Sequence, residues 1–322
     1  MVQMKAKLMQ LKWPILSSIL LLGLGTIYLN ATQHTYILPA YSDGSSRASV
    51  KIHLPSNYAS RSSWPVLISL HGFHSDQLVQ YNLFRLHELV DELGFILVTP
   101  SGRKEDSTAG WRFWDANNFC CNFTGRSNSD FNYLKDLVNT LNDDSSYSRI
   151  DLNKVYFFGH SNGGAMSYKM ACGWSKVKGI ISVAGFMSRK DDSGNLISTG
   201  TDPCPDEGPT KIVQIHGTDD DSIFWNGDVD SALPGSSHNQ IWSVPQLMEN
   251  WLVHNNCTST SDFSASSVNA VSSTSGNETE VRRYHGCDSG GEVVRYKVDN
   301  GTHNLNLRKS FLKSVLAEMM NL

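Results

Sequence analysis

The chain lacks the features that mark nucleic-acid-binding and metal-dependent proteins. It contains no basic run of any length, and its 31 acidic residues outnumber its 27 lysines and arginines. That mildly acidic balance disfavours a nucleic acid as partner. No Cys-x-x-Cys pair occurs among the 6 cysteines, and no spacing of cysteine and histidine matches a zinc site. We therefore expect no nucleic acid, no metal and no cofactor.

Internal repeats and linkers to a second module are also missing. The stretch 258–279 is rich in serine and threonine and has few large apolar residues, which is typical of a surface excursion. A chain of 322 residues, 40% of them hydrophobic, is long enough for one large α/β domain or two small ones. We expect a single domain over residues 32–322.

The N-terminus has a basic flank followed by an apolar run. Three lysines within the first twelve residues precede the apolar segment 13–29. This order is typical of a secretory signal, and we expect residues 1–31 to be a signal peptide cleaved just after Ala31. No clean Ala-x-Ala site follows, and the run is close to the length of a membrane span. An uncleaved signal anchor is therefore the alternative, and only then is a membrane a partner.

The number of cysteines agrees with export, because an even number favours disulfides and disulfides form in oxidising compartments. The six are Cys120, Cys121, Cys172, Cys204, Cys257 and Cys287. In a eukaryotic host, glycan acceptors would be Asn122, Asn256, Asn277 and Asn300. We expect a secreted glycoprotein.

The chemistry centres on a Gly-x-Ser-x-Gly motif. The β-branched and aromatic run 154–158 ends at Gly159, and good helix formers follow Gly163, so the pattern is strand, sharp turn, helix. The two glycines remove side chains that would collide with the neighbouring strand and helix. Such a nucleophile elbow exposes the hydroxyl of Ser161, which we predict to be the nucleophile.

Other segments alternate between strand and helix patterns around this elbow. The expected strands are 49–55, 65–70, 95–99, 154–158, 179–185, 211–217 and 293–298. The expected helices are 81–93, 165–171, 309–322 and one that starts at 130 and ends near 142–144. The alternation indicates a mostly parallel sheet covered on both faces. Together with the elbow it predicts the α/β-hydrolase fold.

A loop that starts with His71 follows the expected strand 65–70. In α/β-hydrolases this loop gives one backbone N–H to the oxyanion hole, and the residue after the nucleophile gives the other. The expected donors are Phe73, or a neighbour in the same loop, and Asn162. His71 itself is expected to hold the loop by hydrogen bonds rather than to act as a base.

The remaining members of a triad follow in the order Ser, acid, His. Three consecutive aspartates, 219–221, come directly after a buried strand, and one of them should orient the histidine; spacing alone does not choose among them. His303 is the only histidine after the last clear strand, which predicts that it is the base. His254 and His285 precede that strand and are assigned to the surface.

These motifs extend over nearly all of the chain after the leader. They are Leu70-His71-Gly72, Pro100-Ser101-Gly102 followed by Trp111 or Trp114, Cys120-Cys121, Asp130, Gly159 to Gly164, and His216 to Asp220. The set resembles the secreted polyhydroxybutyrate depolymerase and feruloyl esterase family. In that family the strand end reads H-G-T-x-D and is followed by a hydrophobic pair, an aromatic residue and N-G, as in 216–227 here. The resemblance implies that Asp220 is the triad acid.

The resemblance also implies the disulfides, and the aromatic residues of a long loop indicate a substrate cleft. The pairs would be Cys172–Cys204, Cys257–Cys287 and a vicinal Cys120–Cys121. Aromatic residues of the irregular segment 103–129, including Phe113 and Phe119, either line a cleft or pack onto the body. The expected cleft residues are Trp111, Trp114 and Trp225.

One departure from the family concerns the residues after the base. The family often has Trp-Pro there, whereas Asn304 and Leu305 follow His303, so we expect a different cleft wall. The sequon at Asn300 lies so close to the base that we expect it to be unmodified.

The prediction is a secreted serine esterase that acts through Ser161, Asp220 and His303 on plant cell-wall feruloyl esters, hydroxyalkanoate oligomers or similar esters. A serine peptidase of the same fold and a catalytically silent binding protein are the alternatives. Silent relatives commonly lack a triad member, and none is missing here.

Overall fold

The computed structural model describes residues 33–36, 47–104, 110–117, 120–122, 130–190, 195–228, 240–258 and 263–322. The predicted leader, residues 1–31, and Phe119 lie outside these ranges. Residues Ala31–Leu322 form one compact unit. Among the helices that the structure describes, none is long and apolar enough to cross a bilayer.

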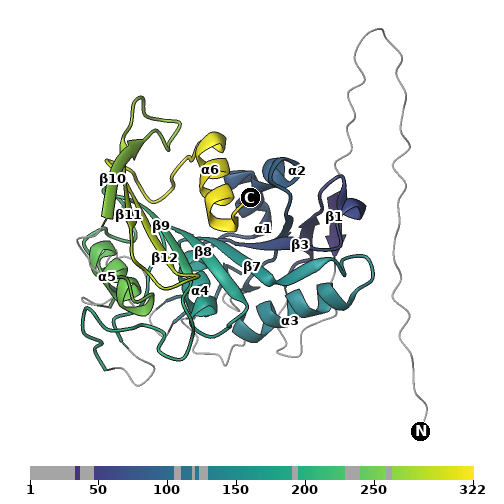
Figure 1. The fold of residues 1–322 in the computed structure, drawn as a ribbon, viewed down its shortest axis with the longest axis horizontal. Helices are drawn as coiled ribbons and strands as arrows, with labels where there is room; N and C mark the ends of the chain where they lie inside the picture. Colours follow the sequence, from purple (N-terminus) through teal and green to yellow (C-terminus); the bar gives the residue numbers. More distant parts are fainter. Residues whose placement is uncertain are drawn as a thin grey trace. The chain divides into compact units, whose positions relative to one another are not determined.

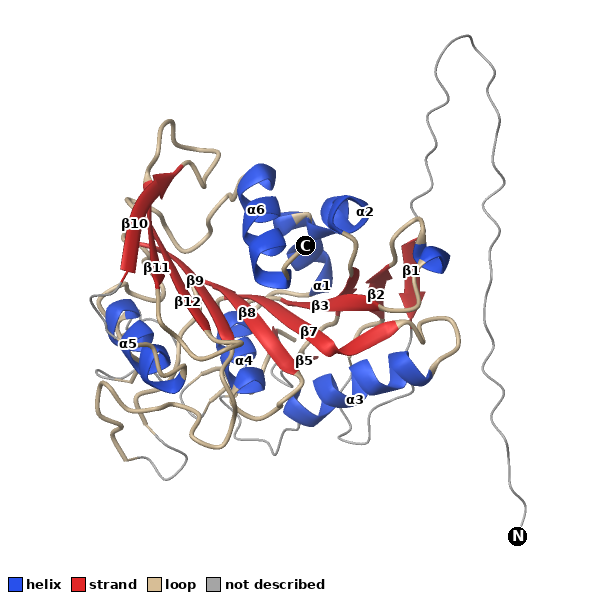
Figure 2. Cartoon of the chain, in the orientation of Figure 1, coloured by secondary structure: helices blue, strands red, loops and turns tan. Residues whose placement is uncertain are grey.

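A sheet of ten strands, counted over the described residues, runs through the centre of this unit (Figures 1 and 2). Its strands in spatial order are β1 (Gln33–Tyr36), β2 (Val50–His53), β4 (Ile96–Thr99), β3 (Trp64–Leu70), β7 (Ile150–His160), β8 (Val177–Val183), β9 (Lys211–Gly217), β12 (Glu292–Val298), β11 (Thr279–Tyr284) and β10 (Phe263–Val268). The run from β4 to β12 is parallel throughout, and antiparallel pairs flank it at both edges. This confirms the expected mostly parallel sheet. A separate two-stranded ladder pairs β5 (Arg103–Lys104) with β6 (Arg112–Phe113).

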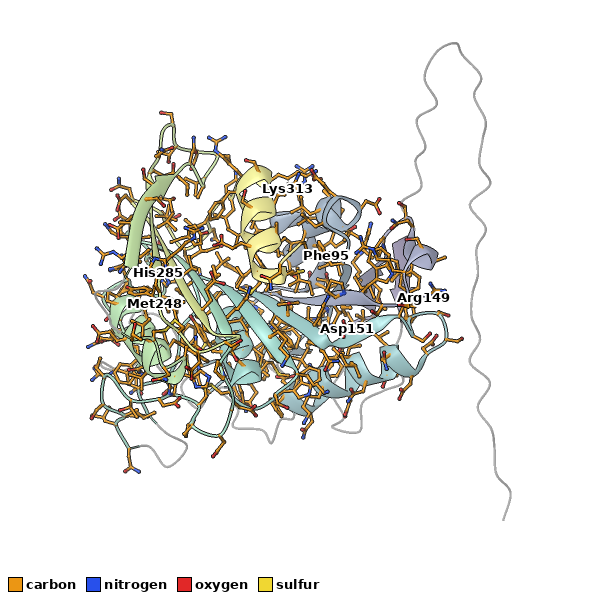
Figure 3. All side chains as sticks on the ribbon, in the orientation of Figure 1. Phe95, Arg149, Asp151, Met248, His285 and Lys313 are labelled. Atoms are coloured by element: carbon orange, nitrogen blue, oxygen red, sulfur yellow. A yellow bond between two sulfur atoms is a disulfide. The ribbon has the colours of Figure 1, made fainter. Side chains whose placement is uncertain are left out.

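Apolar side chains cover both faces of the sheet. In β7, Val155 and Phe157 belong to one hydrophobic cluster and Tyr156 and Phe158 to the other, because successive side chains of a strand point to opposite faces. Central strand β3 is buried at every position. Phe95 and Met248, labelled in Figure 3, belong to opposite clusters.

Helices lie on both sides of the sheet (Figure 1). On one side are α1 (Gln77–Phe84), α2 (Val90–Leu93) and α6 (Lys309–Met320), and on the other are α3 (Asp130–Asp143), α4 (Asn162–Ala171) and α5 (Val244–His254). Two 3-10 turns, η1 (Tyr58–Ser60) and η2 (Leu86–Leu89), complete the described helical segments. The sheet is therefore covered on both faces, as the strand pattern predicts.

Three local expectations differ from the structure. The helix expected over 81–93 is interrupted, because Arg85 adopts a left-handed conformation with φ of 50° and ends α1. Helix α5 was not expected, although Ser243 and Gln246 form a capping box at its start. The serine- and threonine-rich stretch 258–279 is more than an excursion, because it contributes β10 to the edge of the sheet.

Candidate active site

Ser161 occupies the turn between β7 and α4. Its φ of 54° and ψ of −120° are rare for a residue with a side chain, and such strain persists only where the surroundings impose it. Two backbone hydrogen bonds hold the turn: the Ser161 N–H donates to Val183 O at 2.8 Å, and its carbonyl accepts from Ala165 N at 3.0 Å. This is the strained geometry of a nucleophile elbow.

The two glycines of the motif permit the close packing of this turn. A β-carbon on Gly159 would overlap the backbone carbonyl of Gly163. A β-carbon on Gly163 would overlap the carbonyl of Leu70 at the end of β3. The steric reason inferred from the sequence therefore holds in the structure.

Asp220 and His303 are joined across the carboxyl ends of β9 and β12. His303 Nδ1 lies 2.9 Å from Asp220 Oδ2 and 3.0 Å from Oδ1. Asp220 is only 4% exposed, whereas Asp219 and Asp221 are exposed. Among these three aspartates, Asp220 is thus the one that contacts the histidine.

The environment keeps Asp220 charged. Burial by itself would raise the pKa of the Asp220 carboxyl, but hydrogen bonds from His216 and His303 hold that pKa below its usual value. Two backbone N–H groups, of Ser222 and Ile223, also donate to Oδ1, at 3.0 Å and 2.8 Å. A charged, buried carboxylate on Nδ1 can orient the ring and stabilise its protonated form.

His160, the residue before Ser161, connects the elbow to the His303 loop. Its Nε2 donates to the carbonyl of His303 at 3.1 Å, and the two rings lie 5.1 Å apart between centroids. Burial, followed by repulsion from His303, lowers the pKa of His160 to about 4, so the ring is neutral. No hydrogen bond joins the Ser161 hydroxyl to the His303 ring in this structure; such bonds are often long in the absence of substrate.

The loop after β3 lies against the elbow. A β-carbon on Gly72 would be 3.3 Å from the Ser161 β-carbon, so the backbone that leads into Phe73 runs beside the hydroxyl. On the other side, Asn162 is the first residue of α4, where N–H groups lack acceptors within the helix. The two segments that carry the predicted oxyanion donors therefore lie next to Ser161.

The side chain of Asn162 has a separate role that the sequence does not indicate. Its Oδ1 accepts from the Trp114 N–H at 2.7 Å, and its Nδ2 donates to the Trp114 carbonyl at 2.9 Å. Trp114 is wholly buried and donates its indole N–H to His71 O at 3.0 Å. The expectation that Trp114 lines an open cleft is therefore wrong: burial of a large apolar ring with its N–H satisfied keeps it in the core.

His71 holds this loop, as its position at the end of a buried strand indicates. Its Nδ1 donates to the Gly72 carbonyl at 2.7 Å, and its Nε2 accepts from the Gly102 N–H at 2.8 Å. Burial lowers the pKa of His71 to about 4, so it is neutral in this position.

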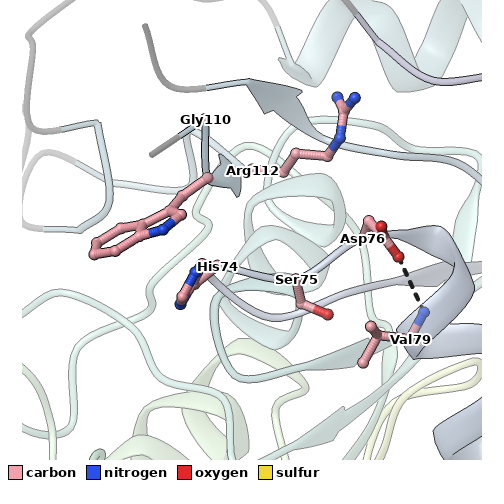
Figure 4. A pocket seen from close by; sticks show the side chains of 7 residues that line it. His74, Ser75, Asp76, Val79, Gly110 and Arg112 are labelled. Atoms are coloured by element: carbon pink, nitrogen blue, oxygen red, sulfur yellow. Dashed lines mark hydrogen bonds between the residues drawn. The ribbon is translucent and has the colours of Figure 1, made fainter. Parts of the chain in front are cut away.

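Trp111 lines a pocket. Its wall includes His74, the residue after Phe73, which is labelled in Figure 4. The pocket has a volume of about 220 Å³, and His74, Ser75 and Asp76 contribute to its wall. The Trp111 and His74 rings lie 4.1 Å apart between centroids. Trp225, the third predicted cleft residue, is half-buried 6.1 Å from the His216 ring.

All six cysteines are paired in the structure. The disulfides are Cys120–Cys121, Cys172–Cys204 and Cys257–Cys287. They are the pairs that the family resemblance implies. One of them ties the end of α4 to the loop before β9.

The two rival histidines differ from each other. His285 is exposed, as expected (Figure 3). His254 is not at the surface, because its ring is buried between Asp202 Oδ1 at 2.9 Å and the Gly208 carbonyl at 3.0 Å. Sequence reasoning also missed the contacts of His160 and His216, although a histidine at the end of a buried strand must find partners.

The sheet order, the elbow and the loops at the carboxyl ends of the parallel strands define an α/β-hydrolase fold. Two solved structures are similar to it: an acetyl xylan esterase from Aspergillus awamori and an S-formylglutathione hydrolase from Agrobacterium tumefaciens. The first has a TM-score of 0.59 and 14% identity over 90% of this chain and 99% of the other. The second has a TM-score of 0.56 and 14% identity over 90% and 95%.

A curated relative is similar over part of the chain. The bifunctional acetylxylan esterase/xylanase of Neocallimastix patriciarum is 27% identical over 174 residues, which are 54% of this chain and 22% of that protein. This chain therefore spans less than a quarter of the length of that relative. No family model matches the chain.

Proposed function

We propose that the chain is a serine esterase that hydrolyses carboxylic esters through Ser161, Asp220 and His303. The observation that carries the proposal is the contact of 2.9 Å between His303 Nδ1 and the buried Asp220. His160 connects the loop of His303 to the strained turn at Ser161. A positive φ at a serine between a strand and a helix is the second support.

In the proposed reaction, Ser161 Oγ attacks the ester carbonyl carbon while His303 Nε2 takes the hydroxyl proton. The carbonyl oxygen becomes negative and accepts hydrogen bonds from the backbone N–H groups of Phe73 and Asn162. Collapse of this intermediate breaks the bond to the alcohol, which leaves with the proton from His303. Water, activated by the same ring, then releases the acid from the acyl-enzyme.

For the substrate we propose an ester of a plant cell-wall carbohydrate, with acetylated xylan ahead of feruloylated xylan. Hydroxyalkanoate oligomers, which contain no carbohydrate, come after both. The sequence similarity to the N. patriciarum enzyme supports this order. The pocket beside the loop of Phe73 supports it too, since it combines the Trp111 ring with the polar groups of Ser75 and Asp76. Aromatic faces and hydrogen-bonding groups together suit a sugar ring.

We further propose that the protein acts outside the cell. The three disulfides support an oxidising compartment, since thiols stay reduced in the cytosol. The basic and apolar N-terminal pattern predicts the export that this requires.

The test is a hydrolysis screen on the purified protein, with Ser161→Ala as the control. The panel contains p-nitrophenyl acetate, acetylated xylo-oligosaccharide, methyl ferulate, hydroxybutyrate oligomers and a p-nitroanilide amide. The proposal requires ester hydrolysis that Ser161→Ala loses. Faster cleavage of the amide than of its matched ester would favour a peptidase instead, and no turnover of any member would favour a silent binding protein.

A further inference from the structure

We infer that His216 is a positioning residue, which holds Asp220 in the orientation that pairs it with His303. The inference rests on the proposed triad and names a group that acts on that triad without touching substrate. His216 lies in β9, four residues before Asp220, and both side chains are fully buried. His216 thus lies at the carboxyl end of β9, and Asp220 lies in the loop that follows this strand.

The tautomer of His216 is set by Gln214, two residues earlier in β9. Gln214 Oε1 accepts the Tyr168 hydroxyl at 2.7 Å, so its Nε2 is the atom that faces the Gly185 carbonyl and His216 Nδ1, each at 2.9 Å. Because Nε2 of an amide is only a donor, His216 Nδ1 must accept. The ring proton is therefore on His216 Nε2.

That proton points to the Asp220 loop. His216 Nε2 lies 2.8 Å from the Ile223 carbonyl and 3.2 Å from Asp220 Oδ2. The Ile223 N–H in turn donates to Asp220 Oδ1 at 2.8 Å. His216 thus contacts the carboxylate directly and also acts through the backbone of Ile223, whose carbonyl accepts from His216 while its N–H donates to Asp220.

The residues behind His216 are buried and hydrogen-bonded. Tyr168 lies in α4, the helix that follows the nucleophile, and Gln214 lies in the centre of the sheet; both are wholly buried. Burial raises the pKa of the Tyr168 hydroxyl, so this group stays protonated and can donate to Gln214. One hydrogen-bonded chain therefore runs from Tyr168 through Gln214 and His216 to Asp220 and His303. A group held this way keeps its geometry during turnover, where small displacements are costly.

The experiment compares His216→Leu with His216→Gln in the full chain. Leucine removes the donor, and glutamine restores one near the position of Nε2. The matched control is His254→Leu, since His254 is another buried histidine with an aspartate and a carbonyl as partners, remote from Ser161 in the sequence and placed in α5. Active sites are counted by labelling with a fluorophosphonate, so that kcat on p-nitrophenyl acetate refers to folded enzyme only.

We expect His216→Leu to lower kcat per labelled site about ten- to hundredfold, the size of a lost hydrogen bond to a charged group, with KM nearly unchanged. The acid limb of kcat/KM should move to lower pH, because a loosened Asp220 stabilises protonated His303 less. The groups that face His303 are Asp220 and His160, and those that face Asp220 are His216 and His303. His216→Gln should recover most of the loss, and His254→Leu should keep the kcat of the unaltered chain.

A second variant covers the case in which His216→Leu does not fold. Gln214→Met leaves the histidine in place but removes the donor to Nδ1, so the ring proton can move away from Asp220. It should show the same fall in kcat and the same shift of the acid limb. An unshifted acid limb with normal kcat in either variant, or equal impairment of His216→Leu and His216→Gln, would overturn the inference. Hydrolysis that survives Ser161→Ala would instead overturn the proposed function.

Discussion

The ring of His160 donates a hydrogen bond to the backbone carbonyl of His303 at 3.1 Å. The two residues are 143 positions apart in the chain, yet the first precedes the proposed nucleophile and the second is the proposed base. The x position of the Gly-x-Ser motif therefore has a structural task here, which is to hold the loop that carries the base.

This contact predicts the effect of His160→Leu. The variant leaves the His303 carbonyl without its donor, so the base should lose its fixed position and kcat on p-nitrophenyl acetate should fall about tenfold. His160→Gln, which offers an amide N–H, should be less impaired. Equal and normal kcat values for both variants would contradict the role of this hydrogen bond.

The three consecutive aspartates should respond very differently to amidation. Asp220→Asn should lower kcat on the order of 10⁴-fold, the size found when a triad aspartate is replaced, because asparagine favours the wrong histidine tautomer. Asp219→Asn and Asp221→Asn change exposed side chains and should leave kcat unchanged. Steady-state kinetics gives kcat for the three variants side by side. A large loss of kcat in Asp219→Asn or Asp221→Asn would assign the triad acid to that position instead.

Replacing Asn162 should affect stability more than chemistry. Asn162→Ala removes both side-chain hydrogen bonds to the Trp114 backbone. The buried Trp114 N–H is then left without an acceptor, whereas the Trp114 carbonyl still accepts from the Ala116 N–H at 2.9 Å. The expected loss in the free energy of unfolding is about 3 kcal/mol, measured by urea denaturation. The backbone N–H at this position remains, so kcat per folded molecule should stay far above that of Ser161→Ala. An unchanged unfolding midpoint would show that the Trp114 contact is not needed.

Stability should fall as the pH drops from about 7 to about 4.5. Burial lowers the pKa of both His71 and His160 to about 4, whereas an unfolded histidine has a pKa of about 6.5. Between these values the unfolded state binds a proton that the folded state does not, so each ring costs on the order of 1 kcal/mol per pH unit of acidification. His160→Gln should flatten the slope, and the exposed control His285→Gln should not. A free energy of unfolding that is constant over this range would rule out the buried neutral rings.

The pocket beside Trp111 predicts a difference between substrates. Trp111→Ala should raise KM for acetylated xylo-oligosaccharide, since the ring forms part of the wall. It should leave p-nitrophenyl acetate almost unaffected, because neither Ser161 nor His303 lines the pocket and a small ester needs few contacts beyond them. The ratio of kcat/KM for the two substrates is the measurement, with the exposed Leu196→Ala as control. A ratio unchanged by Trp111→Ala would exclude the pocket as part of the carbohydrate site.

The features that depend on short segments of sequence could be predicted correctly. The elbow could be predicted because its requirement is steric and acts between near neighbours, from Gly159 to Gly163. The parallel sheet could be predicted because apolar runs such as 65–70 only suit strands that are buried on both faces. Arg85 shows the limit, since no local signal marks the left-handed residue that interrupts the helix there.

Burial of individual rings could not be predicted in this way. Trp111 and Trp114 are three positions apart in one segment that looked irregular in the sequence. Trp111 lines a pocket, whereas Trp114 is buried in the core and its backbone N–H donates to the Asn162 side chain. His254 and His285 look alike in the sequence, but only the first meets an aspartate and a carbonyl in the interior. These outcomes depend on chain segments that are distant in sequence.

The sequence by itself determined the strand, turn and helix around Ser161, the α/β class and the order of the serine, acid and histidine. These follow from periodicity and from the space that glycine leaves, which are properties of short segments. Spacing alone left the three aspartates open, and the family resemblance selected Asp220; the tertiary structure shows the contact of Asp220 with His303. Only the tertiary structure revealed that His160 and His216 contact the two loops. The contacts of His303 with Asp220 and with His160 join the carboxyl ends of different strands, and the His216 contact depends on how the loop after β9 folds back. Their geometry therefore exists only after the sheet and its loops have formed.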